Sequence, residues 1–495
     1  MKTLALDGIL LMVGIFAGCG GGSMGTTNPP PPPPRTINAS LTVDSTNNGA
    51  FDLAMSTSFQ PAEWDDTFFQ NNPGIKQTLL GKLQPHHIRL QTVSQGVPQT
   101  SASAWDFSVL DAITQPVLAV GDHSPEMQLG WAPNFMWSNG SLDAQQFAAY
   151  AQDMVAYYNH AGGFNAADGN HASPSGIPIQ WWGILNEPSI NNVPDAATYT
   201  QIYNQVVPAM LSTPSRTSLK FVALELCCSS ENWAQTFAAN VNTQVDAVAV
   251  HYYSSCNQRD TDAQLMSTVP GFASGVQAIS FDLQTSGNPL VDNAPVWITE
   301  NNVNADYNNN GMSACNPSQV FVTDDRGSSA FFAAWRPYVF SQVGKAGAKA
   351  LYHWDFDADA QFGEVDYNTA NTQLSYWVDY WLGQMFPAGS GQLQLQSTNT
   401  DTADIELLPV LNVDGSVVVM VSNHAVASPT DNNGAGLAAD VAVDTSALGS
   451  FNSASELIID STTSAATGPS PVTISPSSPI KLQLNGYSVA FIKLQ

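Results

Sequence analysis

The chain has 495 residues, of which 43% are hydrophobic and 10% aromatic, so it can bury more than one small core. Acidic residues outnumber basic ones 41 to 14, and the net charge of −27 argues against nucleic acids and anionic polymers as partners, because both would be repelled. A neutral substrate fits this charge. The simpler reason for the acidic surface is that it keeps an exported protein in solution.

Residues 1–19 have the pattern of an export signal. The apolar run at 9–18 is too short for a permanent membrane helix. Two small residues then precede Cys19, as in a bacterial lipoprotein signal, and cleavage there would leave Cys19 as a lipidated N-terminus. An ordinary signal peptide is the alternative. The Gly/Ser/Pro-rich residues 20–36 indicate a linker, so we expect an exported protein that is either lipid-anchored in the bacterial cell envelope or secreted.

Between residues 51 and 385, nearly continuous apolar runs alternate with amphipathic stretches. Runs of this kind are typical of parallel strands that are covered on both faces. Eight strands are predicted, in the segments 51–57, 86–91, 126–133, 179–188, 219–226, 245–253, 294–302 and 348–357.

The intervening stretches predict helices at 104–121, 142–163, 195–211, 231–241 and 325–347. In the second of these, one face carries Phe147, Tyr150, Met154, Val155 and Tyr158, and the pair Gly162-Gly163 is expected to end the helix. Repeated strand–helix units over this length predict a (β/α)8 TIM barrel. A doubly wound open sheet is the competing fold, but the sequence has neither a G-x-G-x-x-G motif nor a P-loop to support it.

The character of the sequence changes at residue 386. From there to 495, short β-rich runs alternate with Gly, Asn, Asp, Ser and Pro turns, which predicts an antiparallel β-sandwich. We expect the segment 37–50 to add a strand to it. A passive, stabilising role for this domain is preferred over carbohydrate binding.

Cysteine spacing gives no sign of a zinc site. Besides Cys19, the chain has Cys227, Cys228, Cys256 and Cys315, which allow three disulfide pairings; Cys256–Cys315 is favoured because it would join two loops. The alternating acids at 355, 357 and 359 lack the ligand array and glycine turn of a calcium loop. Neither a metal nor another cofactor is therefore expected.

Three predicted strands end in reactive side chains. The fourth ends in Asn186-Glu187-Pro188, the sixth in His251-Tyr252-Tyr253, and the seventh in Glu300. Chemistry in a (β/α)8 barrel is located at the carboxyl ends of the strands, so Glu187 and Glu300 should face one pocket. Two convergent carboxyl groups are what glycoside hydrolysis requires, one as acid and the other as nucleophile or base.

These motifs resemble those of a known group of enzymes. W-x-x-x-N-E-P on strand four and I-T-E on strand seven are similar to the retaining glycoside hydrolases of clan A. Residues 105–136 and the C-terminal sandwich most resemble glycoside hydrolase family 39, which includes β-xylosidases and α-L-iduronidases. The resemblance implies that Glu187 is the acid/base and Glu300 the nucleophile.

The same resemblance implies the substrate-binding residues. Asn186 matches the asparagine that bonds the sugar 2-hydroxyl, and Arg89 the arginine that supports the nucleophile. His251 and Tyr253 match H-x-Y on strand six, and Trp354 matches a sugar platform on strand eight. Trp131 and Trp182 are further candidate platforms, because pyranose rings pack on aromatic faces.

Two other acids, Glu225 and Glu364, compete with this pair. Glu225 lies within its strand and is interpreted as a substrate contact or a paired structural acid.

The sequence thus predicts a retaining hydrolase that cleaves β-glycosidic bonds of a plant or microbial polysaccharide or oligosaccharide, first of all a β-xyloside. The alternative is a surface lipoprotein that binds glycans on a hydrolase scaffold without catalysis. In either case we expect a carbohydrate as the partner and no nucleic acid. Contact with a membrane is expected only through the lipid anchor.

Overall fold

The computed structural model describes residues 36–60, 72–92, 96–121, 124–191, 193–227 and 231–495. The predicted signal, the predicted lipidation site at Cys19 and nearly all of the predicted linker lie outside these residues, as does Cys228. Within the described ranges, no helix is both long and apolar enough to cross a membrane.

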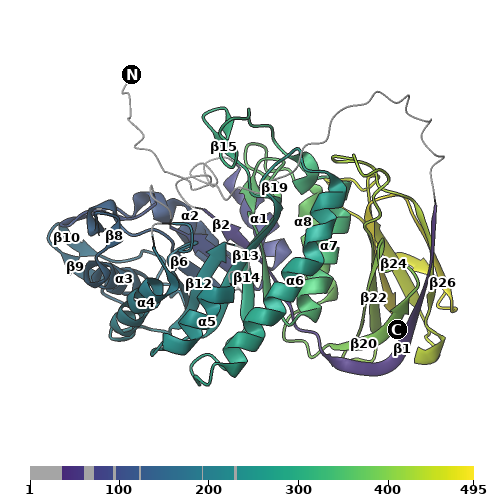
Figure 1. Cartoon of the computed structure of the whole chain (residues 1–495), viewed down its shortest axis with the longest axis horizontal. Coiled ribbons are helices and arrows are strands. Elements are labelled where there is room, and N and C mark those ends of the chain that lie inside the picture. The colour runs from purple at the N-terminus through teal and green to yellow at the C-terminus, as the bar shows by residue number, and fades with distance from the viewer. Residues whose placement is uncertain (1–35, 61–71, 93–95, 122–123, 192, 228–230) are drawn as a thin grey trace. The chain divides into compact units, whose positions relative to one another are not determined.

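Eight parallel strands form a closed barrel in the order β11-β12-β13-β14-β17-β2-β3-β6 (Figure 1). Each corresponds to one of the eight apolar runs, so the predicted (β/α)8 barrel is confirmed. The strands are β2 (Ala54–Phe59), β3 (His87–Gln91), β6 (Ser124–Leu129), β11 (Trp181–Ile184), β12 (Lys220–Cys227), β13 (Ala247–Ser255), β14 (Val296–Asn304) and β17 (Ala350–His353).

The α-helices in the described residues are α1 (Pro73–Leu83), α2 (Ser108–Val120), α3 (Ala144–Asn159), α4 (Ala196–Leu211), α5 (Glu231–Asn240), α6 (Asp262–Thr285), α7 (Ala330–Lys345) and α8 (Leu374–Met385). Asp143 caps α3 by accepting from the backbone N–H groups of Gln145 and Gln146. The helix ends at Asn159, before the expected glycine pair, because His160 already adopts an extended conformation. Similarly, α7 begins at Ala330, after the short 3-10 helix η2 (Asp325–Gly327).

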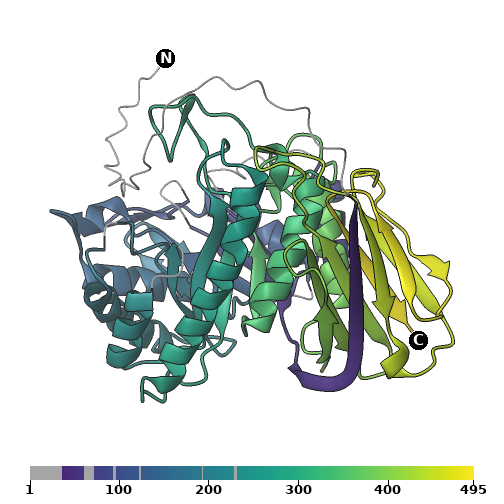
Figure 2. The ribbon, with the colours of Figure 1, turned by 45° about the vertical axis from the view of Figure 1, so that its right-hand side comes forward.

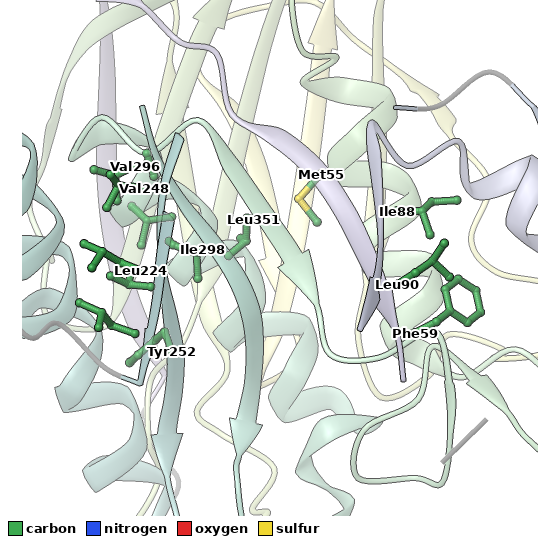
Figure 3. Packing of buried hydrophobic residues seen from close by; sticks show 14 of the residues in the cluster. Met55, Phe59, Ile88, Leu90, Leu224, Val248, Tyr252, Val296, Ile298 and Leu351 are labelled. Carbon is green, nitrogen blue, oxygen red and sulfur yellow. The ribbon is translucent and has the colours of Figure 1, made fainter. Parts of the chain in front are cut away.

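Alternation along the strands divides the barrel residues between two apolar layers. Leu224, Val248 and Ile298 face the helices and belong to the main core (Figure 3). Ala249 and Trp297, their neighbours in sequence, belong to a separate cluster contributed by six strands, which therefore fills the inside of the barrel. Aromatic rings pack together inside the barrel: the centroid of the Trp297 ring lies 4.6 Å from that of His87 and 4.4 Å from that of Trp181.

The C-terminal sandwich is one curled sheet of nine strands, ordered β25-β24-β27-β22-β21-β20-β1-β23-β26. Its members are β1 (Ile37–Ala50), β20 (Leu393–Asn399), β21 (Ile405–Leu411), β22 (Val417–Asn423), β23 (Ala439–Asp444), β24 (Ala454–Ile459), β25 (Val472–Ile474), β26 (Ile480–Leu484) and β27 (Ser488–Leu494). The short 3-10 helix η3 (Ser446–Leu448) lies between β23 and β24. Figure 2 shows β1, in purple, beside the yellow and green strands of this sheet.

One pairing in this sheet departs from the predicted antiparallel pattern. β1 pairs antiparallel with β20 but parallel with β23. Because β1 comes from the other end of the chain, no hairpin fixes its direction.

Short two-stranded sheets and one 3-10 helix decorate the barrel loops: β4 (Gln99–Ser101), β5 (Ala104–Trp105), η1 (Asn134–Met136), β7 (Trp137–Ser138), β8 (Ser141–Leu142), β9 (Phe164–Ala166), β10 (Gly169–His171), β15 (Asn308–Asn309), β16 (Met312–Ser313), β18 (Asp357–Ala358) and β19 (Val365–Asp366). The predicted disulfide between Cys256 and Cys315 is present and joins the loops that follow β13 and β14.

Candidate active site

The carboxyl ends of β11 and β14 bring Glu187 and Glu300 together. One carboxylate oxygen of each, and one ring nitrogen of His251, all lie within 4.8 Å of one another. The Glu187 side chain is 18% exposed and that of Glu300 is 8% exposed, so both border the surface of a mostly buried cluster.

Glu300 is held at both of its oxygens. Arg89 donates from Nη1 to Oε1 at 2.9 Å, and the Tyr253 hydroxyl donates to Oε2 at 2.9 Å. Arg89 also donates from Nη2 to Asn186 Oδ1 at 2.9 Å, which fixes the amide that precedes Glu187. These donors fix the orientation of the Glu300 carboxylate.

His251 lies between three carboxylates. Its Nδ1 is 2.9 Å from Glu187 Oε1 and 3.4 Å from Glu300 Oε2, while Nε2 is 3.1 Å from Glu225 Oε2. Strand alternation explains the H-x-Y spacing, because His251 and Tyr253 face the inside of the barrel and Tyr252 packs outward on Phe272.

Two β-bulges aim side chains into this cluster. The register between β12 and β13 shifts between Ala223 and Leu226, and the register between β13 and β14 shifts between Val250 and His251. Each shift inserts one extra residue, in β12 and in β14 respectively. Thr299 and Glu300 therefore both reach inward, although they are consecutive in the strand.

The candidate sugar platforms occupy different places. Trp354, at the end of β17, is 6% exposed and packs with Tyr253, Ala358 and Phe362. Trp131 is partly exposed and, with Asn186, lines a small recess at the barrel mouth.

Trp182 does not reach the mouth. It alternates with Trp181 and Gly183 and therefore faces the helices, where it is fully buried and donates from Nε1 to the Ile179 carbonyl. We remove it from the substrate-binding candidates, since a side chain in the core cannot contact a sugar.

Glu225 and Thr299 complete the cluster. Glu225 is paired with Arg89 and His251, as the interpretation of a paired structural acid expected, whereas Thr299 was not among the predicted site residues. Glu225 is fully buried, which excludes direct contact with a substrate. Its Oε2 accepts from Thr299 Oγ1 at 2.5 Å, from His251 Nε2, and from Arg89 Nη2 at 3.3 Å. Both residues lie at a bulge in their strand, and the apolar periodicity of the sequence does not reveal where a bulge occurs. Glu364, the other rival acid, is fully buried and accepts from Thr57 Oγ1.

The charges of the cluster are mutually dependent. Burial alone would lower the pKa of His251, but Glu300, Glu187 and Glu225 outweigh it and raise that pKa to about 10. Burial alone would raise the pKa of Glu225, but Arg89 and His251 bring it below its usual value. The pKa of Glu126, also inside the barrel, is raised well above its usual range by burial and by Glu225.

Among the residues that the structure describes, two groups of side chains have the donor types of a metal site. They are Glu187, His251 and Glu300 at the mouth, and His353, Glu364 and Asp379 in the interior. In each group an arginine already pairs with one of the acids, Arg89 with Glu300 and Arg336 with Asp379. These fixed positive charges oppose a cation, and we assign no metal to either group.

Comparison of the sequence with models of protein families and with curated proteins gives no match. Comparison of the structure with solved structures gives strong ones. A GH39 β-xylosidase from Caulobacter crescentus shares 14% sequence identity with a TM-score of 0.60, and the match covers 93% of this chain and 100% of that one.

Members of two other families align over the same extent. A GH51 α-L-arabinofuranosidase from Thermotoga petrophila has 11% identity and a TM-score of 0.67, covering 92% of this chain and 100% of its own. The catalytic domain of a GH30 xylanase from Talaromyces cellulolyticus has 14% identity and a TM-score of 0.58, covering 92% and 100%. The chain therefore shares the barrel-and-sandwich fold of these glycoside hydrolases.

Proposed function

We propose that the protein is a retaining glycoside hydrolase in which Glu300 is the nucleophile and Glu187 the acid/base. The observation that carries this proposal is the approach of their carboxylate oxygens to within 4.8 Å at the carboxyl ends of β11 and β14. Retaining enzymes place these carboxyl groups about 5–5.5 Å apart, whereas inverting ones need about 6.5–9.5 Å to admit a water molecule. The shared fold supports the same reaction class.

The two acids differ in the way the reaction requires. Glu300 is the more buried and carries a hydrogen bond on each oxygen, so it can attack the anomeric carbon while Glu187 protonates the departing oxygen. The glycosyl–Glu300 ester forms as the glycosidic bond breaks. In the second step Glu187 takes a proton from water, the water oxygen bonds to the anomeric carbon, and the ester bond to Glu300 breaks.

For the substrate we propose a β-glycoside, with β-xylosides to be tried first. The sequence motifs support this choice, and the structurally similar proteins include β-xylosidases, an endoxylanase and arabinofuranosidases. Arabinofuranosides are the second choice, because a GH51 arabinofuranosidase shares the fold as well as a GH39 β-xylosidase does. A glycan-binding protein without catalysis is less well supported, because binding alone does not require two close carboxylates with a cation between them.

The test is a panel of aryl β-glycosides and aryl arabinofuranosides with the wild-type protein, Glu300→Ala and Glu187→Ala. We expect turnover to fall by about 10²–10⁴-fold in Glu187→Ala and at least as far in Glu300→Ala. Glu456→Ala, on β24 of the sandwich, is the matched control and should keep full activity. NMR of the first-formed sugar should show retention of anomeric configuration. Inverted product, or full activity without Glu300, would contradict the proposal.

A further inference from the structure

Glu225 occupies an unusual position in the backbone of β12. It lies in the bulge, and both Leu224 (φ 77°) and Glu225 (φ 46°) adopt left-handed conformations that side-chain-bearing residues rarely take. Each such residue costs about 1–3 kcal/mol and persists only where its surroundings hold it. Leu224 donates its N–H to the Tyr199 hydroxyl, and that hydroxyl donates to the Ile184 carbonyl, so the bulge is anchored to β11.

The bulge connects Glu225 to both halves of the site. Through its backbone, the Glu225 carbonyl accepts the N–H of Glu187 at 2.9 Å. Through its side chain, Oε2 accepts from His251, Arg89 and Thr299. A regular strand could not make both connections, because without the extra residue the side chain would turn toward the helices.

The contacts of His251 determine its charge. A neutral imidazole has one N–H, but both nitrogens of this ring lie within hydrogen-bond distance of carboxylate oxygens. Both nitrogens can donate to these oxygens at once only when the ring is an imidazolium. The titratable groups that face it directly are Glu187, Glu225 and Glu300, and Arg89 and Glu126 lie behind Glu225 and Glu300.

We propose that Glu225 is a positioning residue that keeps His251 doubly protonated between the two catalytic carboxylates. This inference rests on the proposed function. The imidazolium places a positive charge beside Glu300, the nucleophile. Its Nδ1 can donate to Oε1 of Glu187 while the proton that this acid transfers is carried on Oε2. Glu225 supplies the negative charge on the far side of the ring that holds the second proton.

NMR titration of the histidine ring nitrogens tests this without any need for turnover. In ¹⁵N-histidine-labelled wild-type protein, the His251 signals, assigned by their loss in His251→Asn, should remain those of an imidazolium from pH 6 to 9. In Glu225→Gln the ring should titrate within that range, since loss of one facing charge shifts a pKa by about 1–3 units. Thr299→Val removes only one hydrogen bond to Glu225 and should give a smaller shift in the same direction, which keeps the test open if Glu225→Gln fails to fold.

Glu364→Gln is the matched control. Glu364 is equally buried, but its Oε2 accepts from Thr57, and the charged groups that act on it are Asp379 and Arg336. Its replacement should leave the His251 titration unchanged.

Activity gives the second readout. In Glu225→Gln the basic limb of the pH profile of kcat/KM should move to lower pH by about one unit or more, following the ring. Three results would each overturn the inference. The first is a neutral His251 in the wild-type protein at pH 7, and the second is the same His251 titration in the wild type and in Glu225→Gln. The third is a shifted titration in Glu225→Gln while the basic limb of its pH profile stays where it is in the wild type. Absence of turnover by the wild-type protein on every glycoside would overturn the proposed function instead, and the NMR titration would still decide whether Glu225 holds the ring charged.

Discussion

At the scale of single residues, Tyr253 is the side chain whose loss should affect the nucleophile with the least disturbance. Its hydroxyl donates to Glu300 Oε2 at 2.9 Å, and the rest of the ring packs on Trp354. Tyr253→Phe removes only that hydrogen bond. Hydrogen bonds to charged groups contribute about 1.5–3 kcal/mol, so we expect kcat/KM to fall about ten- to hundredfold with the fold intact.

Steady-state kinetics on the best aryl glycoside measures this effect. Tyr203→Phe is the control, because the Tyr203 hydroxyl donates to the Gln244 carbonyl and does not contact the site. Equal losses in the two variants would show that Tyr253 acts through stability alone.

His251 should also make the stability of the protein depend on pH. Its pKa is about 10 in the folded protein and 6.5 when unperturbed, so its charge stabilises the fold fully below pH 6.5 and this stabilisation is lost as pH rises through 10. The difference in unfolding free energy between wild type and His251→Gln should therefore narrow by several kcal/mol from pH 7 to 10, at about 1.4 kcal/mol per pKa unit.

Denaturant unfolding at several pH values measures this difference. His424 is the control, because burial lowers its pKa to about 4, and it is neutral in both states above pH 7. His424→Gln should show a constant difference over that range. A constant difference for His251→Gln as well would contradict the assigned charge.

At the scale of elements, β11 and β12 fit together through Gly183. A Cβ atom at this position would lie 2.6 Å from Gln128 Cγ and 3.0 Å from Glu225 Oε1. Gly183→Ala should therefore displace Glu225, lower stability by about 1–3 kcal/mol and reduce activity. Gly271→Ala is the control: the glycine is exposed in α6 with no atom near its Cβ position, so alanine there should be neutral or stabilising by up to about 1 kcal/mol. Thermal unfolding of the two variants decides between these outcomes.

Elements also show how far the sequence can be interpreted. The eight strands were predictable because parallel strands buried on both faces leave long apolar runs, and Glu187 and Glu300 followed from their place at the ends of two of them. The bulges were not predictable, because one inserted residue leaves the composition of a strand unchanged. Glu225 could therefore be interpreted as a paired acid, but its place in a bulge and its contact with Thr299 could not be predicted. Trp182 was misplaced because adjacent tryptophans look alike in sequence, while strand alternation sends them to opposite faces.

At the scale of the whole molecule, barrel and sandwich share one core. In β22, Val418 and Met420 belong to the same apolar cluster as the barrel helices, while Val417, Val419 and Val421 fill the inside of the sandwich. Polar contacts join the same surfaces: Glu406 accepts from Ser341 and Lys345 of α7. The sheet is therefore apolar on both faces, and separation from the barrel would expose one of them.

We accordingly expect residues 36–495 to unfold in a single cooperative transition. Differential scanning calorimetry of the full chain should show one peak, and removal of 386–495 should leave an aggregating protein, because the core face of α7 and the strand β1 would lose their partners. Two separate transitions, with an active barrel after the first, would show that the sandwich is an independent module.

The most direct test of the account is to trap the glycosyl–enzyme. The wild-type protein would be incubated with activated 2-deoxy-2-fluoro β-xyloside, β-glucoside and α-L-arabinofuranoside, and the labelled peptide located by mass spectrometry. We predict that one of these sugars adds a single label, and that it is attached to Glu300. A label on any other residue, or rapid turnover of the parent glycosides by Glu300→Ala, would contradict the assignment of Glu187 and Glu300 as the catalytic pair.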